Sequence, residues 1–337
     1  MRAVVSVCVA ALLISAVALV FVAVRDGDVL IPNAYSQTSS TKVNNFIKTV
    51  LAATTFQAAH DAAKRITFTS AELGMLATVY NDPTSAFRKK LDQLYSAYLA
   101  SPEYQALWQP LETASVAKLD SLKLAYSNSL KAKGLQVTNA LAAISTTCSA
   151  TTPSINSVVG QPIVPGVAFG VVGNGFGSGS GTVKVLIAGT QYPATVISWG
   201  NCKVGAYLSN TMSGLKASNS ATLILTTTKT QTSTATVNFA PLLEIRTLTG
   251  HDSCDGMFDG CSENRTYHDY PLKNDWYVKA QILSEACDGH AEFISKPAWN
   301  VPNVLAKTVI HMGCSANDVV CWKLWTYIEG PKGLAYK

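Results

Sequence analysis

An unbroken apolar run near the N-terminus constrains the fold of this chain more than any other feature. Residues 3–24 (AVVSVCVAALLISAVALVFVAV) form a stretch of 22 residues without a charged side chain. As a helix, the run would extend roughly 33 Å, which matches the hydrocarbon core of a bilayer. It is also longer than the apolar core of a usual cleaved signal. We therefore predict a transmembrane signal-anchor over residues 1–25, with a cleaved signal peptide as the alternative.

The charges that flank this run predict its orientation. Arg2 precedes the run, whereas Arg25 is followed by Asp26 and Asp28, which leave no positive excess on that side. Flanks rich in Lys and Arg stay in the cytoplasm, so the chain after residue 25 is expected on the exocytoplasmic side. Cleavage would leave the body on the same side. We predict a single-pass membrane protein that contacts the membrane through residues 3–24, or a secreted protein if the N-terminus is removed.

Composition excludes two other classes of protein. Of the 337 residues, 48% are hydrophobic and 14% are charged, against roughly 25% charged in an average soluble domain. So many apolar residues exclude a disordered chain. The net charge is only +5, and the longest basic block is Arg88-Lys89-Lys90. We therefore expect no nucleic-acid partner.

A helical region is predicted after a short polar stalk at 26–40. Residues 41–149 are rich in Ala, Leu, Lys and Gln, with apolar residues at helical spacing. Asp82 before Pro83 and Ser101 before Pro102 are typical helix starts. Lys133-Gly134 is interpreted as a stop or kink. We predict an all-α bundle of three to five helices, in which His60 is a partly exposed helical residue without a ligand.

The pattern changes to β-structure over residues 150–241. Val, Ile, Thr, Gly and Ser dominate there, and short alternating runs are separated by turn residues. The expected strands are 182–187, 194–199, 204–208, 221–228 and 233–239. Several short strands at this regular spacing predict an antiparallel β-sandwich.

Several segments of this region resemble an IPT/TIG domain, which has an immunoglobulin-like fold. They are PSINSV from Pro153, VAFGVVGNGFG from Val167, and VKV and VISW, with VNFAP closing the region at Pro241. The resemblance covers about 90 residues (153–241), and Cys202 and the insertion at 178–181 depart from the family pattern. It implies a spacer, adhesion or interaction module and supplies no catalytic residues. The glycines at 173–177 are no dinucleotide fingerprint, because the third glycine and the following helix are missing.

The last region, 242–337, is expected to be a small, disulfide-rich, mainly β domain. Strands are predicted at 276–283, 290–295 and 304–311, and a closing strand or short helix within 314–327. The whole chain is thus predicted to be multi-domain α + β: a transmembrane helix, an all-α bundle, an immunoglobulin-like β-sandwich and the Cys-rich domain.

Cysteines are expected to form disulfides, because the body is exported. Cys8 lies in the apolar run, and seven more follow: Cys148, Cys202, Cys254, Cys261, Cys287, Cys314 and Cys321. Pairs 254–261, 314–321 and 148–202 would leave Cys287 unpaired, but spacing alone does not determine connectivity. Asn264 is a glycosylation candidate in an Asn-Arg-Thr sequon.

Three histidine–cysteine spacings resemble zinc sites. They are His251-x-x-Cys254, Cys287-x-x-His290 and His311-x-x-Cys314. Zinc would need thiolates, whereas an exported chain oxidises its cysteines. We therefore predict no metal and no cofactor.

Aromatic residues are dense in the same region, and they are interpreted mainly as core. The six are Trp276, Tyr277, Trp299, Trp322, Trp325 and Tyr327. Any that are exposed could form a surface for a sugar or a protein partner.

No hydrolase, kinase or nucleotide-binding motif occurs in the chain. We therefore expect a membrane-anchored exocytoplasmic structural or interaction protein, of a cell surface or of a membrane-containing virion, with a protein partner and no catalytic residues. The alternative is a carbohydrate-active enzyme or lectin with its site in residues 250–330.

Overall fold

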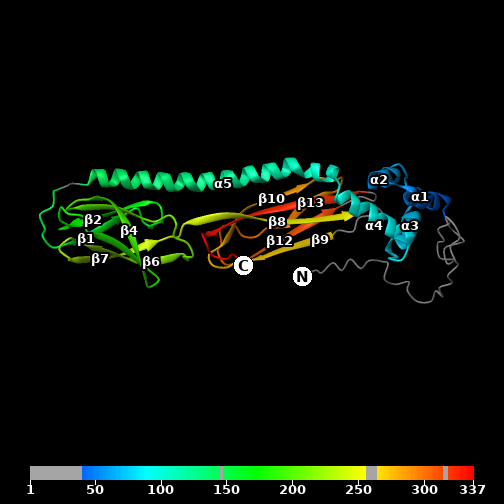
Figure 1. The fold of residues 1–337 in the computed structure, drawn as a ribbon. Helices are drawn as coiled ribbons and strands as arrows, with labels where there is room; N and C mark the ends of the chain where they lie inside the picture. Colours follow the sequence, from blue (N-terminus) through cyan, green and yellow to red (C-terminus); the bar gives the residue numbers. More distant parts are fainter. Residues whose placement is uncertain (1–39, 145–146, 256–263, 314–317) are drawn as a thin grey trace.

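The computed structural model describes residues 40–144, 147–255, 264–313 and 318–337. A long helix runs beside two β domains, and four short helices lie at one end of the molecule (Figure 1). The helices are α1 (Thr41–Ala52), α2 (Phe56–Lys64), α3 (Ser70–Asn81), α4 (Ala86–Leu99) and α5 (Pro102–Ala143).

Each of these helices begins after a Ser or Thr whose hydroxyl accepts a backbone N–H of the first turn. Such caps satisfy amides that have no partner within the helix. The predicted start at Ser101 is confirmed. Asp82 follows α3, as expected, but Ser85 caps α4. The Asp82 carboxylate instead accepts bonds from the backbone N–H and hydroxyl of Thr84, at 2.8 and 2.7 Å.

Helix α5 continues through the predicted stop at Lys133-Gly134 and contains 42 residues. A glycine costs a helix interior about 1 kcal/mol, which packing beyond it can offset. Val137 is buried there against the first β domain. The prediction of a break was wrong because α5 is held by tertiary contacts on both sides of the glycine.

The first β domain is one antiparallel sheet of seven strands, in the order β1-β2-β5-β4-β3-β6-β7. They are β1 (Ser154–Val159), β2 (Ala168–Asn174), β3 (Thr182–Ile187), β4 (Thr190–Trp199), β5 (Lys203–Leu208), β6 (Ser218–Thr226) and β7 (Thr232–Phe239). The sheet curls until β1 lies beside β7, and Ile163 bridges Phe239. The predicted strands are present, but they form one nearly closed sheet and not two stacked ones. The resemblance to IPT/TIG domains stays a prediction.

The second β domain consists of two facing three-stranded antiparallel sheets, β10-β13-β8 and β11-β12-β9. Their strands are β8 (Leu243–Asp255), β9 (Asn264–Pro271), β10 (Tyr277–Glu285), β11 (His290–Ser295), β12 (Leu305–Gly313) and β13 (Val319–Pro331). Between the sheets, Trp322 and Leu324 of β13 pack with Ile310 of β12. The segment that was predicted as a closing strand or helix is thus a strand.

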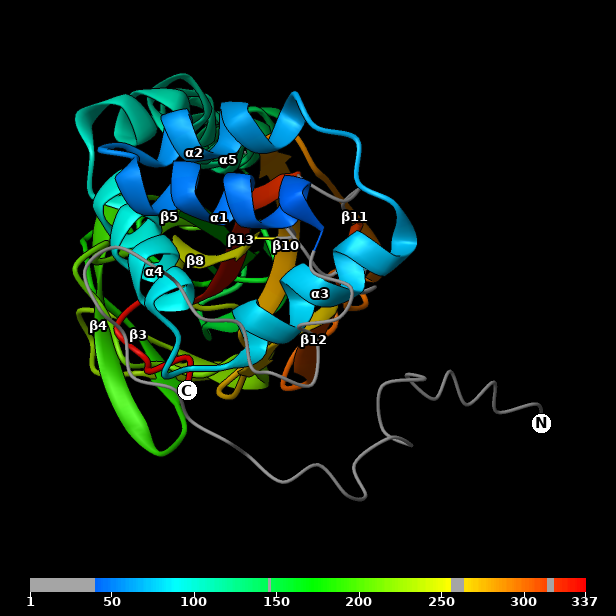
Figure 2. The same cartoon turned by 90° about the vertical axis from the view of Figure 1, so that its right-hand side faces the viewer.

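The predicted independent all-α bundle was wrong, because the helices share one core with strand β13. Phe56 of α2 and Trp108 of α5 belong to the same buried cluster as Trp325 and Tyr327 of β13. Figure 2 shows α1 and α2 in front of β10 and β13, with α5 running back above the sheets. Short helices with one apolar face must bury it on a neighbour, and the outer face of this sheet is that neighbour. The helices thus form a cap on the second β domain, and α5 connects this domain to the first β domain.

The predicted transmembrane segment, residues 3–24, and the stalk up to residue 39 lie outside the described residues. Among the helices that the structure describes, none is both long and apolar enough to cross a membrane. The predicted fold class is therefore corrected: in place of a separate all-α bundle and a two-sheet sandwich, the described residues form a helix-capped β architecture.

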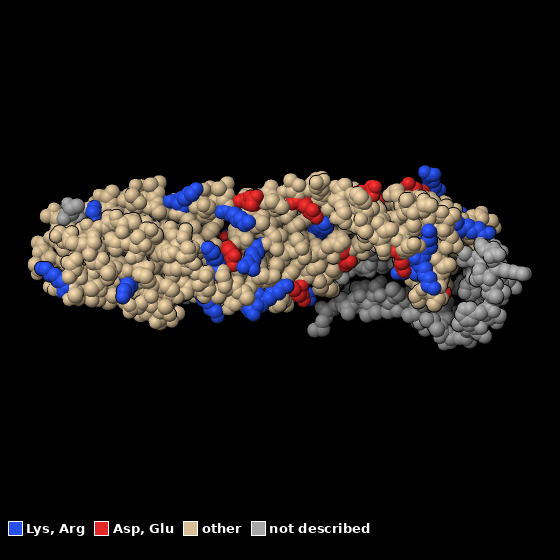
Figure 3. Space-filling model, viewed as in Figure 1, with Lys and Arg blue, Asp and Glu red and all other residues tan. Residues whose placement is uncertain are grey.

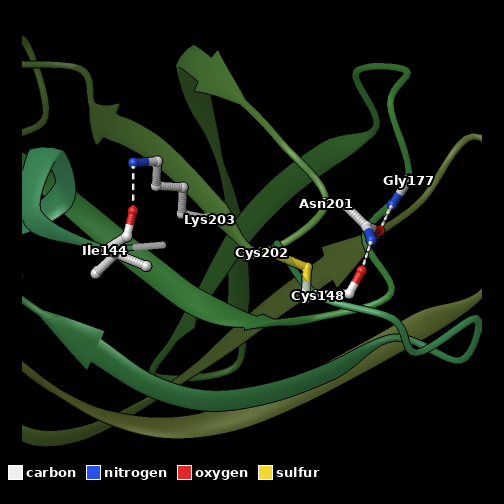
Figure 4. Close-up of a disulfide and its surroundings, with 6 residues drawn as sticks. All are labelled: Ile144, Cys148, Gly177, Asn201, Cys202 and Lys203. Atoms are coloured by element: carbon white, nitrogen blue, oxygen red, sulfur yellow. Dashed lines mark hydrogen bonds between the residues drawn. A yellow bond between two sulfur atoms is a disulfide. The ribbon is translucent and has the colours of Figure 1, made fainter. Parts of the chain in front are cut away.

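The C-terminal end of α5 is fastened to the first β domain (Figure 4). Lys203 donates to the carbonyl oxygens of Leu141 and Ile144, at 2.7 and 2.9 Å. Four carbonyls lack partners at a helix end, and a lysine is a favourable cap there. The Cys148–Cys202 disulfide and a bond from Asn201 to the Cys148 carbonyl hold the following segment. This pair was one of those suggested by the sequence.

Candidate functional site

Two adjoining cavities lie in the helical cap, the larger among the helices and the smaller where the cap meets the second β domain. The larger measures about 470 Å³ and the smaller about 260 Å³, and both are lined by Phe56, Gln57 and Tyr98. We call them together the cap groove. The larger compartment is completed by Thr54, Thr55, Leu94, Ala97, Ser101 and Glu103, and the smaller by His60, Lys64, Leu107, Ala286, Cys287, Asp288 and Val319.

Aromatic rings line the middle of the cap groove. The Phe56 and Tyr98 rings are stacked, with centroids 5.1 Å apart and an angle of 23° between planes. The ring centroid of Tyr95 lies 5.1 Å from that of Phe56, and the centroid of Tyr104 lies 5.3 Å from that of Tyr98. Phe56 is buried, whereas Tyr98 is half-buried. Burial, together with the charge of Asp288, raises the pKa of Tyr98, so its hydroxyl stays a neutral donor.

Charged side chains gather in the smaller compartment. The Asp288 carboxylate forms an ion pair with Lys64 and lies 3.6 Å from Nε2 of His60. The His60 ring is stacked on Phe56 with 5.9 Å between centroids. His60 is only 4% exposed, so its interpretation as a partly exposed residue was wrong. One turn further along α2, Lys64 keeps 41% of its side chain exposed.

The turn that carries Asp288 is held to strand β13. Ala286 donates to the carbonyl of Cys321 at 3.1 Å, and Gly289 donates to the carbonyl of Val319 at 2.9 Å. A disulfide joins Cys287 to Cys321 between these two bonds. The position of Asp288 beside the cap is therefore set by a backbone clamp and a covalent link.

The disulfides confirm the expected oxidation of cysteines but correct one pairing. Cys321 pairs with Cys287 and not with Cys314, and Cys287 is not the unpaired cysteine. Strand pairing decides this, because the end of β10 lies beside the start of β13. Cys8, Cys261, Cys314 and the side chains of Cys254 and Asn264 lie outside the described residues, and the predicted 254–261 pair lies there too.

Of the described metal candidates, His251 lies apart from His290 and His311. His251 contacts the Tyr104 hydroxyl through Nε2 at 2.8 Å, and burial lowers its pKa. His290 and His311 flank Glu292 on another sheet, at 3.6 and 3.5 Å. Across the described parts of the chain, no three His, Cys, Asp or Glu side chains are grouped to hold a metal ion.

The six candidate aromatic residues do not form an exposed surface. Trp276, Trp322, Trp325 and Tyr327 are buried, whereas Tyr277 is half-buried and donates to Glu329. Of the six, Trp299 alone is exposed, at 39%. The predicted core role of most of them therefore agrees with their burial, and a sugar-stacking patch in 250–330 is not assembled from them.

Sequence reasoning missed Phe56, Tyr98 and Lys64. Their spacing in α2 and α4 resembles that of ordinary core and surface positions, and Asp288 lies more than 180 residues away in the chain. The available signal was weak: a histidine and a lysine on an alanine-rich helix that begins with an aromatic residue.

Charge is sparse over the first β domain and more frequent over the second domain and the helical cap on the face that Figure 3 shows. On this face, Lys and Arg alternate with Asp and Glu without forming one continuous basic surface. A phosphate backbone would need such a surface.

No family model and no curated protein matches the chain. Among solved structures, a γ-CGTase from an alkalophilic Bacillus clarkii is 22% identical over 39% of this chain and 17% of its own, with a TM-score of 0.24. An auxiliary nutrient binding protein from Bacteroides thetaiotaomicron is 15% identical over 29% of this chain and 22% of its own, with a TM-score of 0.21.

A third similar structure is SGBP-B, from a complex xyloglucan utilization locus in Bacteroides uniformis. It is 9% identical over 54% of this chain and 74% of its own, with a TM-score of 0.20. The chain spans less than a quarter of the length of the first two structures. Likeness at this level concerns parts of the fold only.

Proposed function

We propose that this chain is an exocytoplasmic binding protein whose ligand occupies the cap groove. The observation that carries this proposal is the stacked Phe56–Tyr98 pair beside the Lys64–Asp288 ion pair. Binding cavities are usually roughly 300–1,000 Å³, mostly apolar, and equipped with a few polar groups. The larger compartment, of about 470 Å³, has this size and composition, and the smaller one adds the charged pair.

Two features support placement outside the cytoplasm. The structure contains the disulfides Cys148–Cys202 and Cys287–Cys321, and disulfides persist mainly in oxidising compartments. The apolar residues 3–24 would direct export of the chain. We propose that the body is displayed at a cell surface or released from it.

The extended body suits a protein that presents its site at a distance. Helix α5 would be about 63 Å long at 1.5 Å per residue, and it contacts both β domains. In this proposal residues 153–241 serve as a spacer or partner-binding module, as the IPT/TIG resemblance implies, while the cap groove binds the ligand.

Blocking the cap groove tests the proposal. Ala97 is exposed and lines the larger compartment, so Ala97→Trp would fill it. We expect the full chain to bind the uncharged, environment-sensitive dye Nile red stoichiometrically, with fluorescence that Ala97→Trp removes. The matched control is Ala142→Trp, at an exposed position on α5, which should leave the signal unchanged. Equal dye binding by wild type and Ala97→Trp would contradict the proposal.

A further inference from the structure

We infer that the cap groove takes an uncharged saccharide, with one sugar ring on Tyr98 and its hydroxyls at Lys64 and Asp288. This inference rests on the proposed function, since it names the ligand class of the same groove. The observation that supports it is that the Tyr98 ring and the Lys64–Asp288 ion pair line the same compartment.

The charges that line the cap groove disfavour anionic ligands. Lys64 and Asp288 neutralise each other in their ion pair. Glu103, in the larger compartment, adds a further negative charge. An anionic ligand would therefore lie near two carboxylates and only one ammonium group. The free-energy cost of removing its hydration shell would then not be offset by attraction to the groove. A ligand without charge avoids this cost.

The apolar side of the cap groove suits the C–H face of a sugar ring. Phe56 is stacked on Tyr98 and restrains its plane, while the Tyr98 and Tyr104 rings meet in a T-shaped arrangement. A half-buried, immobilised ring loses little conformational entropy when a ligand stacks on it. Leu94 and Ala97 extend the apolar surface on the same side.

The polar side suits neighbouring hydroxyl groups. A hydroxyl both donates and accepts, so one hydroxyl of a vicinal pair can donate to Asp288 while the other accepts from Lys64. The two side chains remain 46% and 41% exposed, which leaves them accessible to a ligand. Hydrogen bonds with charged partners are the stronger ones. Gln57 lines both compartments, and its Nε2 donates to Asp61 at 2.9 Å, so its amide oxygen supplies a further acceptor.

The experiment uses the purified full chain in a detergent without a sugar head group. A glycan array identifies the preferred saccharide, and isothermal titration then compares the neutral oligosaccharide with its uronate analogue. We expect saturable binding of the neutral sugar and weaker binding of the uronate. Tyr98→Ala should weaken binding about ten-fold, whereas Tyr98→Phe should retain most of it because the ring stays.

Asp288→Asn should also weaken binding, because a neutral amide replaces the charged acceptor. The matched control is Tyr267→Ala, which removes an exposed tyrosine on strand β9 and should leave the affinity unchanged. Circular dichroism melting curves show whether each variant is folded. Sugar binding that is equal in wild type, Tyr98→Ala and Asp288→Asn would overturn this placement of the ligand.

Two negative results separate this inference from the proposed function. If no neutral sugar binds while the dye still enters the wild-type groove and not Ala97→Trp, the ligand class is wrong and the binding groove stands. If isothermal titration showed that the groove binds an aromatic peptide in preference to the neutral sugar, the ligand class would likewise be wrong while the binding groove stands. If both the sugars and the dye fail to bind, the proposed function falls as well.

Discussion

The hydroxyl of Tyr327 lies 2.9 Å from Oγ of Ser115 and donates to the Ser115 carbonyl at 3.0 Å. Ser115 is in the first third of α5 and Tyr327 is in β13, 212 residues later in the chain. Both residues are buried. This contact joins the long helix to the second β domain inside the core, where an unpaired polar group would be costly.

Removing the Tyr327 hydroxyl should therefore destabilise the protein. Tyr327→Phe keeps the ring but leaves the Ser115 hydroxyl and carbonyl without this partner, which costs about 1–3 kcal/mol. Urea unfolding of the full chain should show the loss as a lower midpoint at an unchanged slope. Tyr267→Phe, at a 55% exposed position, is the matched control. Equal midpoints for both variants would contradict the role of the contact.

Gly170 is expected to be intolerant of a side chain because α5 approaches it closely. A Cβ there would lie 2.5 Å from Leu141 of α5 and 2.6 Å from Val159. Gly170→Ala should lower the free energy of unfolding by about 1–3 kcal/mol. Leu141→Ala should cost less in the Gly170→Ala background than in wild type, because the two changes relieve one clash.

Gly200→Ala is the control for that series, since its nearest contact would be an ordinary 3.5 Å. Additive effects of Gly170→Ala and Leu141→Ala in the unfolding measurement would show that the helix does not press on this strand.

Lys203 should determine how firmly the C-terminal turn of α5 is held. Lys203→Met removes both hydrogen bonds to the carbonyls of Leu141 and Ile144 while it keeps most of the apolar stem. We expect faster amide hydrogen exchange in the last turn of α5 and unchanged exchange in its first turn. Lys229→Met, at an exposed turn, should change neither. Uniform acceleration along α5 would indicate global destabilisation and not loss of a cap.

Stability should fall in mild acid because of His268. Burial lowers the pKa of His268 below its usual value, so the folded state binds the proton less readily than the unfolded state. The free energy of unfolding should be highest above the ordinary histidine pKa of about 6.5 and decrease as the pH falls through it. His251, whose pKa burial also lowers, acts in the same direction. His268→Gln should flatten the pH dependence of the melting temperature between pH 7 and 5, and an unchanged slope would contradict this.

The two disulfides should have different effects on ligand binding. Replacing Cys287 and Cys321 by serine frees the turn that carries Asp288 and should reduce both stability and affinity in the cap groove. Replacing Cys148 and Cys202 should reduce stability alone, because that bridge is in the other β domain. Each loss of stability is expected to be about 2–4 kcal/mol. Equal affinities for the two double variants in dye titration would contradict a positioning role of the Cys287–Cys321 bridge.

Local features of the fold were predictable from the sequence by itself. Alternation of Val with Lys and Thr predicted strand β3 over 182–187, and Ser101 before Pro102 predicted the start of α5. Both signals arise from neighbouring residues, since strand periodicity and helix caps act within one turn or one strand. The excess of cysteines after the apolar run likewise predicted disulfides without their pairing.

Tertiary structure decided which of these elements pack together. The helices of 41–143 bury their apolar faces on β13 and not only on one another, because Trp325 and Tyr327 offer them a large apolar surface. The pairing of Cys287 with Cys321 follows from strand register, and the cap groove exists only because the turn at Asp288 comes to lie beside α2. Such contacts depend on the closure of long loops and on burial in a common core. A local sequence pattern does not indicate which distant segment its residues will contact.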